Sequence, residues 1–218
     1  MKHFVIPFAM ILAAPATAET FDVLLGNKSL GQLNYEKKGS TATLRTALNN
    51  TPMGVFNGTF TGTSTGNSKS ANFIGDSRSS RKRRVVRVEI AKGRASSTDI
   101  KPASEITDLS DVARVPAGVT DPVRVIAALI SADGCPDSMK MYDGRRVVTF
   151  AQKAGKVEDD TLTCNMTYRV TAGPGHLSAL GIKSAEFELT YVTGGSDQSL
   201  RQIKVSSGIF RLTLDRKE

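Results

Sequence analysis

One short segment of the chain has the pattern of a helix, and that helix is apolar on almost every side. Asp121 suits the position that caps a helix N-terminus, and Pro122 suits the first helical position. Arg124 is the only charged residue between Pro122 and Ile130, and apolar residues recur at helical spacing: Val123, Ile126, Ala127 and Ile130. A helix with so little polar surface has to be enclosed by other elements.

The rest of the chain has the alternating pattern of half-buried β-strands. Phe187, Leu189 and Tyr191, for example, alternate with polar residues, and the Asp143-Gly144 pair is typical of a two-residue hairpin turn. The segment 102–118 is interrupted by prolines and glycine, and we expect it to be irregular, with one helical turn near 104–108. The predicted strands cover residues 21–25, 29–37, 41–49, 53–63, 69–77, 85–91, 139–142, 145–151, 160–171, 185–193, 202–206 and 209–214.

These two patterns together predict a mainly β fold. We expect a single, strongly curved antiparallel sheet, in the form of a half-barrel or open barrel, wrapped around the one apolar helix. Curved sheets bend at glycines and bulges, and the chain has 19 glycines. The sequence predicts one β-rich domain over residues 19–218.

The first 18 residues have the pattern of a secretory signal peptide. Lys2 precedes an apolar run over 4–14, and Ala16 and Ala18 supply the small residues of a signal peptidase site. The apolar run is too short to span a bilayer, and no later stretch is apolar enough to do so. No cysteine lies near the site, so we expect an exported protein cleaved after Ala18, not a lipoprotein, in the periplasm.

The charge of the chain limits its partners. Because Lys2 is the only charged residue that cleavage removes, the formal net charge falls from +8 to +7. A basic protein in this compartment meets lipopolysaccharide, anionic phospholipid, wall polymers or acidic proteins, whereas nucleic acid is not expected there. The alternative is that the positive charge serves solubility alone.

The two cysteines, Cys135 and Cys164, are predicted to form a disulfide. The periplasm is oxidising, and two cysteines in such a compartment usually pair. A redox-active pair is the weaker alternative, because the C-x-x-C spacing is missing.

A run of basic residues is the most distinctive charged feature: Arg78, Arg81, Lys82, Arg83, Arg84 and Arg87. On a hairpin loop, such a run could bind phosphates or an anionic membrane face. The alternative is a solvated loop whose charge prevents aggregation through a sheet edge. These six residues are the predicted candidate site for an anionic partner.

Several short motifs resemble a periplasmic family known as domain of unknown function 3108. They lie at 121–129, 141–146 and 164–170, in the ending 208–214 and in the opening hairpin from residue 21. The resemblance covers nearly the whole mature chain and implies an exported, β-rich envelope protein without accepted catalytic residues. The predicted architecture is also similar to the half-barrels of lipoprotein carriers, which bind acyl chains, although a fold alone does not determine function.

The chain offers little for catalysis. His176 is the only histidine after cleavage, Asp159 and Asp160 form a lone carboxylate pair in a predicted turn, and no metalloprotease or serine-hydrolase motif is present. We expect no cofactor and no metal site. The leading hypothesis is a non-enzymatic envelope protein that binds a lipid or acyl chain in its concave sheet. The alternative is an interaction module that meets an anionic polymer, lipid or protein through its basic loop, and a hydrolase is the third.

Overall fold

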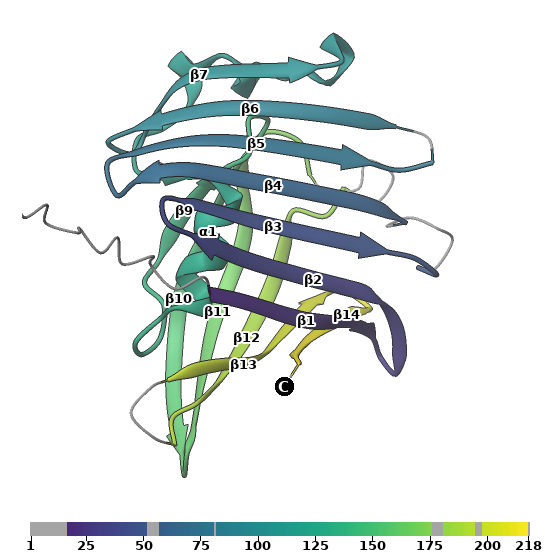
Figure 1. The fold of residues 1–218 in the computed structure, drawn as a ribbon, viewed down its shortest axis with the longest axis vertical. Coiled ribbons are helices and arrows are strands. Elements are labelled where there is room, and N and C mark those ends of the chain that lie inside the picture. Colours follow the sequence, from purple (N-terminus) through teal and green to yellow (C-terminus); the bar gives the residue numbers. More distant parts are fainter. Residues whose placement is uncertain (1–16, 52–56, 81, 176–180, 195–197, 218) are drawn as a thin grey trace, which may run out of the picture.

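The computed structural model describes residues 17–51, 57–80, 82–175, 181–194 and 198–217. Its strands form one 14-stranded sheet, curved into a nearly closed barrel around one helix, so the predicted fold class is confirmed (Figure 1). The order across the sheet is β7-β6-β5-β4-β3-β2-β1-β14-β13-β12-β11-β10-β9-β8. All neighbours pair antiparallel except β8 and β9, which are parallel.

The elements follow one another as hairpins, interrupted once between β7 and β9. The first half consists of β1 (Thr17–Leu25), β2 (Lys28–Lys38), β3 (Thr41–Leu48), β4 (Gly58–Asn67), β5 (Ser70–Arg78), β6 (Arg83–Ala91) and β7 (Arg94–Lys101). Three short 3-10 helices follow: η2 (Ala103–Glu105), η3 (Asp108–Ser110) and η4 (Val112–Arg114). The second half consists of β8 (Val119–Thr120), α1 (Pro122–Ile130), β9 (Met139–Tyr142), β10 (Val147–Glu158), β11 (Thr161–Ala172), β12 (Ser184–Val192), β13 (Ser199–Ser207) and β14 (Phe210–Arg216).

The elements differ from the predicted ones in several places, and β10 and β13 in particular are longer than expected. β7 was not predicted, because its sequence is polar and Ile100 is its one fully buried residue. β4 runs from Gly58 to Asn67, past the predicted end at residue 63, and residues 53–56 of the predicted strand lie outside the described residues. The irregular segment after β7 contains three 3-10 helices instead of a single helical turn.

The gap between the two edge strands, β7 and β8, is closed by single hydrogen bonds. The backbone oxygen of Gly93, in the β6–β7 turn, accepts from Gly118 N at 2.8 Å and from Val119 N at 3.0 Å. Farther along, the buried hydroxyl of Tyr142 donates to Leu109 O at 2.5 Å and lies 3.0 Å from Thr98 Oγ1 on β7. These contacts join β9 and the 3-10 helices to the edge of β7 where a strand pair is missing.

Helix α1 lies inside the barrel and joins two hydrophobic clusters. Val125 and Leu129 pack with β1 and the C-terminal strands, and Val123 packs with the strands of the first half. The exposed fractions of these three side chains are 0–1%. Ile126 is only half-buried and packs against both clusters, while Ala128 is exposed. The enclosure predicted for this helix is therefore observed, with one narrow face left open.

The N-terminus of α1 is fixed to the turn between β4 and β5. Asp121 Oδ1 accepts hydrogen bonds from the backbone nitrogens of the first turn, and its Oδ2 accepts from Ser64 Oγ at 2.7 Å. Arg124 donates to the backbone oxygens of Asn67 and Ser70, both at 2.7 Å. The polar groups at this end of the helix satisfy one another, so we interpret them as structural.

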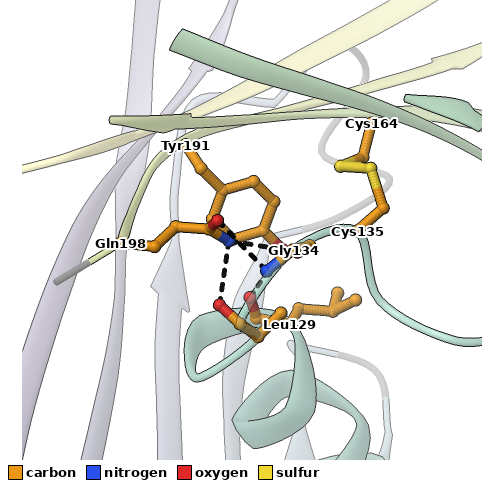
Figure 2. Close-up of a disulfide and its surroundings, with 7 residues drawn as sticks. Leu129, Gly134, Cys135, Cys164, Tyr191 and Gln198 are labelled. Carbon is orange, nitrogen blue, oxygen red and sulfur yellow. Dashed lines mark hydrogen bonds between the residues drawn. A yellow bond between two sulfur atoms is a disulfide. The ribbon is translucent and has the colours of Figure 1, made fainter. Parts of the chain in front are cut away.

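The C-terminus of α1 is fixed to the opposite wall (Figure 2). Tyr191, on β12, donates through its hydroxyl to Leu129 O at 2.7 Å. Gln198 donates to the backbone oxygens of Ala132 and Gly134 and accepts from Gly134 N at 3.1 Å. Both ends of the helix are thus held by the sheet that surrounds it.

The predicted disulfide between Cys135 and Cys164 is present and ties the loop after α1 to β11 (Figure 2). The sulfur of Cys135 lies against Gly155 on β10, where a Cβ atom would come within 2.6 Å of it. A larger residue at 155 would therefore displace either the disulfide or the strand.

We expect the disulfide to contribute about 3–4 kcal/mol to the free energy of unfolding, because it closes a 29-residue loop in the unfolded chain. Urea unfolding of the wild type with and without reductant measures this difference. The double variant Cys135→Ala/Cys164→Ala serves as the control and should not respond to reductant. Free alkylation of both thiols in denatured, non-reduced protein would contradict the prediction.

Candidate functional site

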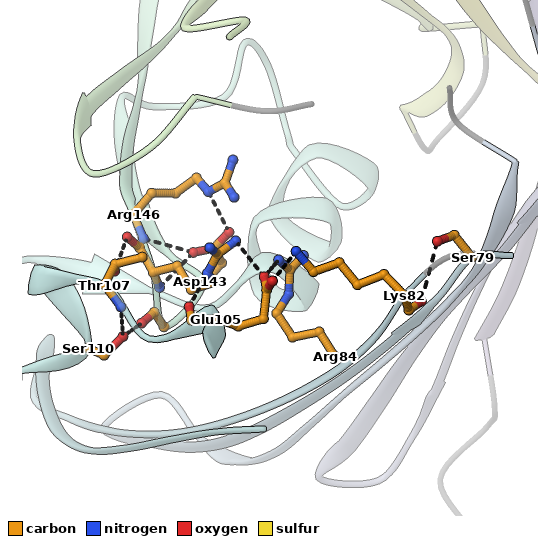
Figure 3. A network of polar contacts seen from close by, with 10 residues as sticks. Ser79, Lys82, Arg84, Glu105, Thr107, Ser110, Asp143 and Arg146 are labelled. Atoms are coloured by element: carbon orange, nitrogen blue, oxygen red, sulfur yellow. Dashed lines mark hydrogen bonds and ion pairs between the residues drawn. The ribbon is translucent and has the colours of Figure 1, made fainter. Parts of the chain in front are cut away.

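The candidate site lies where β5 joins β6 and where β9 joins β10. Because consecutive strands run antiparallel, these two connections lie at the same end of the barrel. The segment around η2 lies between them and links them through ion pairs (Figure 3). We call this region the cationic rim and define it by six described residues: Arg78, Lys82, Arg83, Arg84, Arg145 and Arg146.

Asp76 pairs with two of these cations. Its Oδ2 lies 3.0 Å from Nη2 of Arg78 and 3.0 Å from Nη2 of Arg83. Hydrogen bonds from these two guanidinium groups lower the pKa of Asp76 to about 2. More than half of each arginine side chain remains exposed, so both can still reach a partner in solution.

Glu105 is the buried centre of the rim. Its side chain is 4% exposed and forms ion pairs with Lys82, with Arg84 at 2.7 Å and with Arg145 at 3.3 Å. Burial alone would raise the pKa of this carboxyl, but hydrogen bonds from Lys82 and Arg84 and the charge of Arg145 outweigh it and lower the pKa. Glu105 is therefore ionised and holds three cations together.

The tight turn before β10 is clamped by the segment from η2 to η3. Arg145 Nε donates to Glu105 O at 2.7 Å, and Thr107 Oγ1 donates back to Arg145 O at 2.9 Å. Ser110 Oγ donates to Gly144 O at 3.2 Å. Burial, followed by repulsion from Arg84, lowers the pKa of Arg145, which reflects the crowding of cations in this region.

The six predicted residues are distributed unevenly in the structure. Arg78, Lys82, Arg83 and Arg84 belong to the cationic rim, whereas Arg81 lies outside the described residues. Arg87 pairs with Asp99 at 3.3 Å across β6 and β7, with both side chains about half exposed. Glu105, Arg145 and Arg146 were not among the predicted site residues, because only the fold brings their segments next to the basic run.

The other residues considered for chemistry lie elsewhere. Asp159 and Asp160 form the exposed turn between β10 and β11, as predicted, and His176 lies outside the described residues. Two surface hollows, of about 390 and 560 Å³, flank the segment from η2 to η4 and share Thr107, Asp108 and Arg114 in their lining. The interior, in contrast, is occupied by α1.

Comparison of the chain with protein-family models and with curated proteins gave no match. Within the described residues, no helix combines the length and the apolar character needed to cross a membrane. The fold and the cationic rim are therefore the features that bear on function.

Proposed function

We propose that this protein is a non-enzymatic component of the bacterial periplasm that binds the anionic lipid surface of the envelope through its cationic rim. The observation that carries the proposal is the charge of the rim, where six cations share three carboxylates: Asp76, Glu105 and Asp143. A surface with excess positive charge attracts phosphate headgroups, at about 1 kcal/mol per basic residue near the membrane.

The periplasmic location is part of the same proposal and rests on the signal-peptide pattern of residues 1–18. Cleavage after Ala18 would remove two residues of β1, which pair with Lys37 and Glu36 at its far end. It would keep Glu19, whose carboxylate pairs with Arg216 of β14 at 2.7 Å. The resemblance to the domain of unknown function 3108 agrees with this location.

The rim is favoured over an acyl-chain site inside the barrel. Val123, Val125 and Leu129 fill the space in which an acyl chain was expected, and both ends of α1 are held by hydrogen bonds. A lipid tail would have to displace this helix. The hydrolase hypothesis depends on Asp159 and Asp160, which lie in an exposed turn.

Vesicle sedimentation tests the proposal. Purified protein comprising residues 19–218 should bind vesicles that contain phosphatidylglycerol and not vesicles of phosphatidylcholine alone, and added salt should weaken the binding because charge drives it. The double variant Arg78→Gln/Arg83→Gln should bind at least tenfold more weakly, since it removes two exposed cations from the rim.

The matched control is Lys153→Gln/Lys204→Gln. These two lysines are also about half exposed, and each pairs with one carboxylate, but they lie on β10 and β13 away from the rim. The control loses the same charge and should bind within about twofold of the wild type. Equal losses in both variants would reject the rim as the binding surface, and salt-independent binding would reject the electrostatic mechanism.

A further inference from the structure

Arg146 is a buried cation that leaves part of its hydrogen-bonding capacity unused. Its side chain is 5% exposed, and among the described residues Nε and Nη1 donate no hydrogen bond. Nε lies 3.1 Å from Asp143 Oδ2 as an ion pair. Figure 3 shows the guanidinium group apart from the ions around Glu105, beyond the carboxylate of Asp143.

Such an arrangement is costly in a folded protein. A guanidinium group has five N–H donors, and burying a charged group without hydrogen bonds destabilises the fold. Asp143 compensates only in part, because its Oδ1 already accepts from the backbone nitrogens of Arg145 and Arg146, each at 3.0 Å. Unpaired buried donors can mark a ligand site, since a ligand oxygen can accept the hydrogen bonds that the protein leaves unmade.

The surrounding charges indicate what kind of ligand would fit. Four cations lie in this region against two carboxylates: Glu105 pairs with Lys82, Arg84 and Arg145, and Asp143, in the adjoining turn, pairs with Arg146. The two remaining positive charges match a phosphate group, which carries up to two negative charges near neutral pH. The guanidinium group of arginine is planar and presents two parallel N–H donors, so it can bind two oxygens of one phosphate group at once.

The turn that carries Arg146 adjoins an open hollow. The hollow of about 560 Å³ is lined by Thr107, which bonds to Arg145 O, and by Gly173. A Cβ atom on Gly173 would come within 2.9 Å of Arg146 Cα, so this glycine allows β11 to approach the turn closely. The hollow reaches the residues beside the turn between β9 and β10, and the side chain of Arg146 lies behind its lining and not in it.

We propose that Arg146 anchors a discrete phosphate-binding site at the cationic rim, in which its guanidinium group donates to the oxygens of a phosphate group. This inference rests on the proposed function and deepens it, because it identifies the chemical group of the envelope surface that the protein recognises. The phosphate is either free inorganic phosphate or the headgroup of a phospholipid, and the test separates the two.

Thermal unfolding with and without ligand tests the site. The probes are inorganic phosphate and dihexanoyl phosphatidic acid, each compared with sodium chloride at equal ionic strength. At ten times its dissociation constant, a bound probe should raise the unfolding midpoint of the wild type by about 3–6 °C. A response to both probes assigns the phosphate group alone, and a response only to phosphatidic acid assigns the lipid headgroup.

The variant Arg146→Met separates a binding role from a structural one. Without phosphate its midpoint should equal or exceed that of the wild type, because an apolar side chain replaces an unsatisfied buried cation. With phosphate it should lack the site-specific rise, although general salt effects on stability persist in both proteins. The control Arg169→Met removes an exposed arginine of β11 and should keep the full response.

Arg146→Lys provides a second measurement that keeps the charge and loses the planar fork, and it should weaken phosphate binding about tenfold. A wild type that does not respond to either probe, or an Arg146→Met variant that responds as the wild type does, overturns the site. Anionic vesicle binding that persists in that case leaves the proposed function standing. A phosphate response without vesicle binding supports the Arg146 site and overturns the membrane surface as partner.

Discussion

The variant Leu129→Asp will fail to fold. Leu129 is fully buried in the last turn of α1, where it packs against the C-terminal strands, and its backbone oxygen accepts the hydrogen bond from Tyr191. An aspartate at this position would place an unpaired charge in an apolar core, at a cost that exceeds what most domains can lose. The expected result is a circular dichroism spectrum without the β signal and no cooperative thermal transition.

The matched control is Ala128→Asp, one residue earlier on the same helical turn. Ala128 is exposed, so an aspartate at this position remains in water. Compared with Leu129→Asp, this variant introduces the same residue at nearly the same distance from the helix end. This variant should fold, with a loss of at most about 1 kcal/mol. A folded Leu129→Asp protein would show that α1 is not held inside the barrel.

Replacing Glu105 with glutamine should lower the free energy of unfolding by about 3–5 kcal/mol, because it removes the one carboxylate that Lys82, Arg84 and Arg145 share. Arg145 is the cation most affected, since only 15% of its side chain is exposed. Urea unfolding at pH 7 measures the loss. The control Asp99→Asn breaks the exposed pair with Arg87 and should cost less than about 1 kcal/mol.

The pH dependence of stability provides an independent check on Glu105. Its pKa is lower in the folded protein than its ordinary value of 4.5, so its contribution is fully present above that value. The contribution is lost as the pH falls through the lowered pKa. The wild type should therefore lose stability in acid more steeply than Glu105→Gln, and parallel curves would contradict the central role of Glu105.

The fold could be predicted from the sequence because two periodicities dominate it. Alternating strands such as β12 and the apolar face of α1 reflect burial directly. Asp143-Gly144 marks the position of its turn through backbone preference, but the connection spans residues 143–146 and not the predicted two residues. β7 escaped prediction because it is an edge strand whose polar sequence is exposed on most positions. Its place is determined by pairing with β6, which is a tertiary contact without a local signature.

The site could be predicted only in part. The basic run at 78–84 can be recognised from the sequence alone. Glu105, the carboxylate that pairs with Lys82 and Arg84 of this run, lies beyond β7 in a segment without periodicity. Arg145 and Arg146 follow a turn, where charged residues are usually solvated, and nothing local indicates that Arg146 is buried. Burial of a charge depends on what the rest of the chain places around it.

The pairing of β1 with β14 determines when this protein can finish folding. Phe21, near the start of the chain, belongs to the cluster formed by the C-terminal strands, and β1 meets β14 from Phe21 to Leu25. During synthesis, the residues of the first seven strands precede α1, which packs against their apolar face in the folded protein. The barrel cannot close until residue 216 is available. A chain of this topology thus depends on protection of its N-terminal half while the remainder arrives.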